Sequence, residues 1–491
     1  MSSPAQPGID RAPAPAATTV IRNAAFAVLW DGTAHHYATD CDIAFSGGRI
    51  THVGPRYEGP ADIEVDGRDR LVMPGLIDAH THPATEPGFK GIREEHGVPR
   101  MGNSGLYERS LAFRLDEDGR RAAQEVAYAE MLASGVTSVV DLTAPFPGWV
   151  ETAAASGLRS FLAPGFRSAA WRLEGDFELK FDWDEAAGRR DFEAALRIVD
   201  ALPQHPSGRL SGVLYPAQIE TVSLDLMKDS IAAARERNIP LTTHVAQSMS
   251  EIAEVEARHG TTPLGFAEDI GLLGPDILIA HVIFIDEHSW IRKEPARDLA
   301  RLVDSGTSVV HCPTPVQRYG HQLENFGRYA KAGVNMCIGT DVSPHNMIEE
   351  MRSALIMARV AASDITATDT AEVFTAATVG GARAMMRDDL GKLAVGARAD
   401  IVLVDLQHPD MIPARDPLRS LVYTAAERAV RDVFVDGHHV VQAGVVTTLD
   451  RQGAAQRLDA AQRRMLAAVP THDFRGRSAE EIAPLSLPMR P

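Results

Sequence analysis

The sequence predicts an α/β protein in which a (β/α)8 TIM barrel is combined with a small composite β-sandwich made from both ends of the chain. Eight apolar runs of strand length alternate with helical patterns through the middle of the chain. Short strand-like runs, separated by polar or glycine-rich turns, precede and follow this region. A doubly wound sheet is the runner-up, but no Gly-x-Gly-x-x-Gly follows a first strand.

The barrel is expected over residues 73–391. Its strands are predicted at residues 75–82, 136–142, 159–164, 212–215, 240–244, 277–281, 308–312 and 334–340. Helical patterns lie between several of them, at residues 120–134, 224–237, 250–259 and 295–305. Gly135, Gly306 and Gly333 fit turns in which glycine ends a helix before the next strand.

The sandwich is expected from residues 19–72 together with residues 392–450. Its strand-like runs are residues 20–29, 42–45, 49–53, 399–405 and 430–437. Residues 1–18 are rich in alanine and proline, which predicts a disordered leader. Residues 451–491 are expected to form a C-terminal helix and a tail.

Composition narrows the range of partners. The 491 residues carry a formal net charge of -17, which argues against nucleic acid and anionic membranes. No stretch has the length and apolarity of a membrane span. Cys41, Cys312 and Cys337 are few and scattered, as reduced thiols are, so the sequence predicts a cytoplasmic protein. We expect its partner to be a small-molecule substrate.

Histidine and aspartate side chains recur where four of the predicted barrel strands end. His80 and His82 end the first strand, and the period of two in a strand places both imidazoles on one face. His244 ends the fifth strand, His281 the sixth and Asp341 the eighth. Because all barrel strands end at the same face, these five side chains should meet over one mouth.

Imidazoles and a carboxylate suit a divalent metal, most simply Zn2+, with a coordination position left for water. Fe2+, Mn2+ and Co2+ accept the same ligands. Such a metal lowers the pKa of water toward neutrality, Asp341 could accept the proton, and His281 could orient the water or polarise the leaving group. One histidine at a strand end is usually a structural polar group, but five such residues together predict a metal site. His311 and Cys312 suggest a second site, although shaping the end of the seventh strand is their simpler role.

The motifs Pro-Gly-Leu-Ile-Asp-Ala-His-Thr-His, Thr-His-Val-Ala, Ile-Ala-His, Val-His-Cys-Pro and Gly-Thr-Asp follow one another in this order. In this the chain resembles the amidohydrolase superfamily, in the branch of cytosine deaminase, adenosylhomocysteine deaminase and the triazine hydrolases. The resemblance implies metal ligands at His80, His82, His244 and Asp341, with His281 catalytic beside them. It also implies a homodimer or a larger homo-oligomer.

Two comparisons with the family refine this interpretation. Binuclear members bridge their metals with a carboxylated lysine on the fourth strand, whereas residues 211–221 contain no lysine, so we expect one metal per chain. Deaminases of this branch usually carry glutamate three residues after the histidine of the fifth strand, where this chain has Gln247. An amide cannot shuttle a proton at neutral pH. Glu251 lies one helical turn further on and could substitute, although a solvated helix residue is the simpler expectation.

The absence of that carboxylate favours a substrate whose carbonyl is already electrophilic. We therefore expect a hydrolase that cleaves a nonpeptide C–N bond of a small aromatic or heterocyclic amide, urea or carbamate. The segments around Gln247 and residues 339–347 also resemble the phenylurea and thiocarbamate hydrolases. The alternative is an aminohydrolase of a nitrogen heterocycle, and a more remote alternative is an inactive barrel with a binding role.

Predicted substrate contacts lie just beyond strand ends or in the loops that follow. They are Gln218, Gln247, His288, Trp290, His321, His345 and Asn346. Residues 84–110 form a long segment of the kind that often acts as a lid. Residues 167–190 carry aromatic side chains, Trp171 among them, that could wall an apolar pocket or serve a subunit interface.

Overall fold

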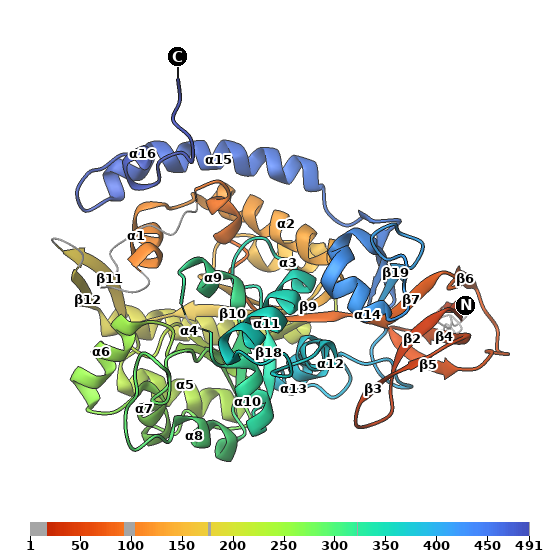
Figure 1. Cartoon of the computed structure of the whole chain (residues 1–491). Coiled ribbons are helices and arrows are strands. Elements are labelled where there is room, and N and C mark those ends of the chain that lie inside the picture. The colour runs from red at the N-terminus through yellow and green to blue at the C-terminus, as the bar shows by residue number, and fades with distance from the viewer. Residues whose placement is uncertain (1–16, 93–103, 175–177, 322, 491) are drawn as a thin grey trace, which may run out of the picture.

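Eight parallel strands close a barrel, as the sequence predicts (Figure 1). The computed structural model describes residues 17–92, 104–174, 178–321 and 323–490. The barrel strands are β8 (Leu76–Thr81), β9 (Val136–Thr143), β10 (Arg159–Phe166), β13 (Leu210–Gly212) continued by β14 (Tyr215–Pro216), β15 (Leu241–Val245), β16 (Ile277–His281), β17 (Ser308–His311) and β18 (Met336–Ile338). Nearly all their residues are buried, as expected for parallel strands covered by helices.

Two parallel sheets make up the barrel wall, with strand orders β13-β10-β9-β8 and β15-β16-β17-β18. Parallel bridges join Leu214 to Leu241 and Gln218 to His244 along one seam. The other seam is bridged between Thr81 and Asp341. The wall is therefore continuous, which excludes the doubly wound alternative.

Helices cover the outside of the barrel. They are α2 (Glu117–Ala133), α3 (Trp149–Ser156), α4 (Glu185–Ala201), α5 (Leu224–Arg237), α6 (Met249–His259), α7 (Pro263–Asp269), α8 (Asp298–Ser305), α9 (Pro313–Arg318), α10 (Phe326–Ala332), α11 (Met347–Ala362), α12 (Thr370–Thr375) and α13 (Gly381–Ala384). The four predicted helices correspond to α2, α5, α6 and α8. Gly306 and Gly333 end α8 and α10 with φ of 71° and 97°, a left-handed conformation that glycine adopts without strain.

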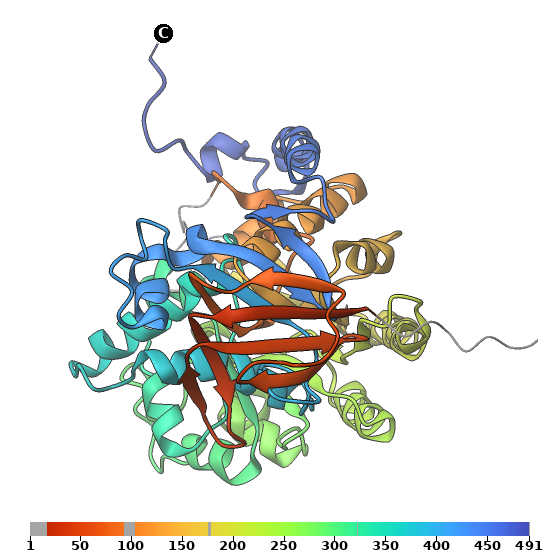
Figure 2. The ribbon, with the colours of Figure 1, turned by 90° about the vertical axis from the view of Figure 1, so that its right-hand side faces the viewer.

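Two antiparallel-rich sheets form the second structural unit (Figure 2). One has the order β5-β4-β1-β6, and the other has the order β22-β21-β20-β19-β7-β2-β3. Their strands are β1 (Thr18–Ala24), β2 (Phe26–Trp30), β3 (His35–Ala38), β4 (Cys41–Ser46), β5 (Arg49–Gly54), β6 (Ile63–Asp66), β7 (Arg70–Pro74), β19 (Ile401–Asp405), β20 (Val430–Val435), β21 (His438–Gln442) and β22 (Val445–Val446). Pairing of β7 with β19 joins the two chain ends within one sheet.

The apolar run 20–29, expected as one strand, is two strands in different sheets. Asn23 has a left-handed φ of 54°, which breaks the extended backbone. Two residues later, the backbone amide of Ala25 donates to the carbonyl of Gly67, and the chain leaves one sheet and enters the other. The polar residues Arg22 and Asn23 interrupt the apolar run at this break.

A buried ion-pair cluster connects the barrel to the sandwich. The Arg159 guanidinium at the start of β10 is 2% exposed and lies 2.9 Å from Asp400 and 3.0 Å from Asp436. Both carboxylates border sandwich strands, Asp400 before β19 and Asp436 after β20. Arg159 thus pairs with both carboxylates at the junction, and Arg398 also contacts Asp436 over 3.0 Å.

The segment after β8 is held from outside by the C-terminal helices α15 (Arg451–His472) and α16 (Ala479–Ile482), which lie along α1 and α2 (Figure 1). This segment contains the 3-10 turn η1 (Glu86–Phe89) and α1 (Ser104–Ala112). Phe89 and Phe113 share an apolar cluster with Met465 and Val469. The amide of Gln462 donates to the carbonyls of Gly88 and Lys90, each over 2.8 Å.

A hairpin of β11 (Ala169–Glu174) and β12 (Glu178–Trp183) follows β10. It accounts for most of residues 167–190, whose structure the sequence left open.

In the segment 84–110, residues 93–103 lie outside the described residues. Among the helices that the structure describes, none is long and apolar enough to cross a membrane.

We predict that Arg159→Met destabilises the protein by about 3–5 kcal/mol, because it leaves the buried carboxylate of Asp400 without its cation. Chemical denaturation followed by circular dichroism measures the change. Arg68→Met is the control, since the Arg68–Asp66 pair is largely exposed and its loss should leave the transition unchanged. Equal transitions for Arg159→Met and the wild type would contradict the assigned role of Arg159.

Candidate metal centre and active site

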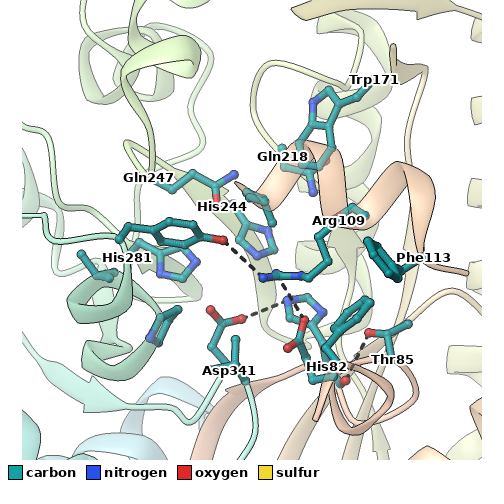
Figure 3. Close-up of a pocket in the computed structure, with 18 of the residues that line it drawn as sticks. His82, Thr85, Arg109, Phe113, Trp171, Gln218, His244, Gln247, His281 and Asp341 are labelled. Atoms are coloured by element: carbon teal, nitrogen blue, oxygen red, sulfur yellow. Dashed lines mark hydrogen bonds and ion pairs between the residues drawn. The ribbon is translucent and has the colours of Figure 1, made fainter. Parts of the chain in front are cut away.

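Four imidazoles and one carboxylate meet at the C-terminal mouth of the barrel. Figure 3 shows the imidazoles of His82, His244 and His281 beside Asp341. The ligand atoms of His80, His244 and His281 lie within 4.8 Å of one another, as do those of His80, His82 and Asp341. Nε2 of His80 is 3.4 Å and Nε2 of His82 is 3.3 Å from Oδ1 of Asp341. The structure therefore brings together all five residues that end the predicted strands.

A β-bulge directs the first two histidines into the site. Ile77 and Ala79 lie in the apolar cluster of the barrel interior. In a regular strand the next residue, His80, would point the other way. The pairing of β8 with β9 shifts by one residue between Asp78 and Thr81, so that His80 and His82 also face the centre.

Local strain accompanies the ends of the strands that carry the site. His281 and Asp341 have positive φ values of 72° and 58°, and Ala246, just after β15, has 56°. Residues other than glycine adopt this region at a cost, and such positions concentrate at functional sites. At these positions the chain turns at the barrel mouth, at or just after the residues of the cluster.

Hydrogen bonds to the backbone orient two of the imidazoles. Nδ1 of His244 donates to the carbonyl of Ala217 over 2.7 Å, and Nδ1 of His82 donates to the carbonyl of Leu142 over 3.1 Å. In each ring this leaves Nε2 as the nitrogen with a free lone pair. Neither ring nitrogen of the buried His80 has a hydrogen-bond partner among the described residues. Such buried, unsatisfied nitrogens fit a site that a cation completes.

Burial and mutual proximity put the cluster in the protonation state that a cation requires. Burial lowers the pKa of His80 and His244, and lowers that of His281 to about 4. Burial alone would raise the pKa of Asp341, but the close approach of the His80 imidazole, 3.4 Å away, and the other neighbouring imidazoles outweigh this and hold the pKa well below its usual value. Neutral imidazoles and an ionised carboxylate are metal ligands.

A buried carboxylate, that of Asp78, fixes β18, the last barrel strand, to β8, the first. Asp78 accepts from the backbone amide of Thr340 over 3.0 Å and from its hydroxyl over 2.6 Å. Burial raises the pKa of Asp78 to about 7. Gly339 permits the approach, because a Cβ there would lie 2.8 Å from the backbone oxygen of His80.

A pocket of about 300 Å3 opens above the cluster. Its wall includes His82, His244, His281 and Asp341, and also Gln218, Gln247, Thr85, Glu86, Phe89, Arg109, Phe113, Arg114, Arg120, Trp171 and Tyr319. Two of the predicted substrate contacts, Gln218 and Gln247, therefore face the space beside the imidazoles (Figure 3). Trp171 comes from the hairpin, where the sequence suggested a pocket wall.

The other predicted contacts lie elsewhere. His345 is fully buried, with Nδ1 3.0 Å from the Thr81 hydroxyl and 2.9 Å from the Thr340 hydroxyl. Asn346 caps α11, accepting from the amides of Ile348 and Glu349. Neither residue lines the pocket. Their nearness to Asp341 in the sequence reflects packing beneath the site and the start of a helix.

His288, Trp290 and His321 form an aromatic cluster around Phe284, with ring centroids 5.0–5.7 Å from that ring. They are absent from the lining of the pocket. His321 also lies 5.7 Å from the ring of Tyr319, which does line it. The cluster thus supports a wall residue from behind.

Glu251 is not solvated, contrary to the simpler expectation. It is 1% exposed, and its carboxylate accepts from the amides of Ala246 and Gln247 over 2.5 and 2.8 Å. Burial and the neighbouring Glu220 raise its pKa. The carboxylate holds the turn after β15 and does not line the pocket, so it positions Gln247.

Sequence reasoning missed the residues that α1 and the loop after β17 contribute to the pocket. The most prominent of them are Arg109 and Phe113 (Figure 3), together with Tyr319. They lie in long connections without strand periodicity, so only their type, a cation and two aromatics, could have drawn attention to them.

Residues 71–440 match the model of the amidohydrolase family. The chain belongs to the amidohydrolase family. Membership identifies it as a hydrolase of carbon–nitrogen bonds other than peptide bonds, and the histidine-rich cluster is the metal site of such an enzyme.

Curated relatives from this family include a 5-methylthioadenosine/S-adenosylhomocysteine deaminase of Haloarcula marismortui. It is 28% identical over 400 residues, which cover 81% of this chain and 87% of the relative. A 5'-deoxyadenosine deaminase of Methanosarcina mazei is 28% identical over 431 residues, which cover 87% of this chain and 94% of the relative.

Solved structures agree with the fold. An adenosine deaminase from Xanthomonas campestris with bound zinc has a TM-score of 0.78 and 24% identity, over 91% of this chain and 98% of that one. An atrazine chlorohydrolase from Arthrobacter aurescens, complexed with zinc, has a TM-score of 0.78 and 22% identity, over 90% of this chain and 100% of that one.

We predict that Asp341→Asn lowers kcat by about 10²–10⁴-fold, the usual contribution of a positioned proton acceptor, and leaves the fold intact. Steady-state kinetics with circular dichroism measures both. The exposed Asp304→Asn is the control and should be unaffected. Near-wild-type activity of Asp341→Asn would refute the assigned site.

Proposed function

We propose that the enzyme cleaves a nonpeptide C–N bond of a small aromatic or heterocyclic amide, urea or carbamate. The observation that carries the proposal is Gln247, which lines the pocket beside His244 and His281. Because Gln247 cannot exchange a proton at neutral pH, the site is better suited to a substrate that needs no proton on a ring atom. Glu251 cannot replace it without giving up the two backbone amides that it holds.

One divalent cation per chain, Zn2+ by preference, is proposed to bind His80, His82, His244 and Asp341. The donor set suits zinc, and the solved adenosine deaminase and atrazine chlorohydrolase described above hold zinc. When bound, such a cation would lower the pKa of water and polarise a carbonyl. The described residues of β13 and β14 contain no lysine to bridge a second metal.

The side chains around this cation have distinct proposed roles. Asp341 accepts a proton from the attacking water. His281, whose pKa is lowered to about 4, hydrogen-bonds to the carbonyl oxygen or delivers a proton to the leaving nitrogen. Gln247 and Gln218 hydrogen-bond to the amide, urea or carbamate group. The aromatic wall of Phe89, Phe113, Trp171 and Tyr319 excludes water and packs against a ring.

A second candidate is an aminohydrolase of a nitrogen heterocycle. It is favoured by the relatives, whose names describe deaminases of adenosine derivatives at 28% identity. Under this alternative, a group other than the side chain of Gln247 must protonate the ring.

We also propose a homo-oligomer in the cytoplasm. Cys41, Cys312 and Cys337 are all free and buried, which suits a reducing compartment. Light scattering coupled to size-exclusion chromatography would test the assembly.

Metal analysis paired with two substrate panels tests the proposal. We expect about one metal per chain and hydrolysis of aryl ureas, anilides or carbamates, with activity lost to a chelator and restored by Zn2+. The second panel holds aminopyrimidines, aminopurines and triazines. Ammonia release from that panel alone would replace the proposal by the deaminase alternative, and activity that survives chelation would refute the metal site.

We further predict that Gln247→Ala reduces kcat/KM by about 10-fold, the value of one hydrogen bond to the substrate. Gln317→Ala, in α9 and outside the pocket lining, is the matched control. An unchanged kcat/KM for Gln247→Ala would exclude Gln247 from substrate binding.

A further inference from the structure

Arg109 places a buried guanidinium in the pocket, across from the metal cluster. Its side chain is 8% exposed and reaches inward from α1 toward the imidazoles and Asp341 (Figure 3). Neither the predicted metal ligands nor the proposed catalytic roles use this residue. A buried cation beside a small-molecule pocket suggests recognition of a negative group.

The guanidinium contacts Phe89, Glu86 and Tyr319. Its Cζ lies 4.9 Å from the centroid of the Phe89 ring, Nη2 lies 3.8 Å from a carboxylate oxygen of Glu86, and Nη1 lies 3.5 Å from the hydroxyl of Tyr319. The contacts to Glu86 and Tyr319 are longer than the 2.7–2.9 Å of a strong charged hydrogen bond. They orient the guanidinium into the pocket (Figure 3).

The charge of the pocket points the same way. Arg109, Arg114 and Arg120 line it, whereas Glu86 and Asp341 are its only carboxylates among the described residues. Asp341 belongs to the metal cluster, and a divalent cation there adds further positive charge. This concentration of positive charge occurs in a chain whose formal net charge is -17. Such a cleft focuses potential and attracts anionic ligands.

The walls specify the rest of the ligand. Phe113, Trp171 and Tyr319 line the same pocket as Arg109, and its volume of about 300 Å3 suits one ring with short substituents. Aromatic side chains beside a cation favour a flat ring that carries a negative substituent.

We propose that the substrate is an aromatic amide, urea or carbamate that carries a carboxylate on the part that is not attacked, and that Arg109 binds this carboxylate. The inference rests on the proposed function and deepens it by naming the substrate class. Arg109 then selects substrates, whereas the metal cluster performs the hydrolysis.

The test compares matched substrate pairs on the metal-loaded enzyme. Each pair consists of an aryl urea or anilide with a ring carboxylate and the same compound with a neutral carboxamide. We expect the wild type to prefer the acid by at least about 10-fold in kcat/KM. Arg109→Gln should lower kcat/KM for the acid by about 10–150-fold, chiefly through KM, as expected for a charged hydrogen bond. The loss on the neutral compound should be at least about 10-fold smaller than the loss on the acid.

Arg121→Gln is the matched control. Arg121 is exposed, does not line the pocket and contacts the carbonyl of Pro147, so its loss should leave both substrates unaffected. Arg109→Lys keeps the charge and loses the fork of donors, and it serves if Arg109→Gln does not fold. We expect Arg109→Lys to retain part of the preference for the acid.

Binding of benzoate and benzamide, measured by calorimetry on the metal-loaded protein, gives a readout apart from turnover. A carboxylate could also bind the metal, in which case Arg109→Gln would bind benzoate as tightly as the wild type does. Equal losses on acid and neutral substrates, or unchanged benzoate binding in Arg109→Gln, would overturn the proposal.

The two proposals fail in different ways. Metal-dependent hydrolysis without preference for the acids would leave the proposed function standing and remove this inference. Benzoate binding that depends on Arg109, without hydrolysis of any panel compound, would keep the carboxylate site and remove the proposed reaction.

Discussion

The contact between the first and the eighth barrel strand determines where the site can form. Asp78 binds both the amide and the hydroxyl of Thr340, and Gly339 lets the two backbones approach. This closure brings His80 and His82 next to Asp341, residues separated by some 260 positions in the sequence. Without it, the histidines of β8 would have no carboxylate partner, and the two sheets of the barrel would meet along only one seam.

Strong local patterns made much of this predictable. The run 277–281 and the helix 224–237 have the predicted bounds, because each combines clear periodicity with clear end signals. The five residues of the metal cluster were predictable because a parallel barrel brings all its strand ends to one face.

At Asn346, two signals in the sequence compete: nearness to Asp341 and the pattern of a helix start. Asn346 precedes Met-Ile-Glu, the pattern of a helix cap, and capping is what the residue does. Arg109 could not be placed, because its position depends on how α1 packs against η1 and the C-terminal helices. Loops take their shape from distant contacts, which no local pattern records.

Residues of the C-terminal helices can change during evolution without affecting the metal cluster. They lie beyond residue 440, where the match to the family ends, yet Met465 and Val469 pack behind Phe89 and Phe113 of the pocket wall. Exchanges at these outer positions can reshape the space for substrate while every ligand of the metal cluster stays unchanged. Relatives that catalyse the same reaction can therefore differ in substrate range through a segment that lies outside the shared domain. A search for substitutions that alter substrate range should begin in this segment.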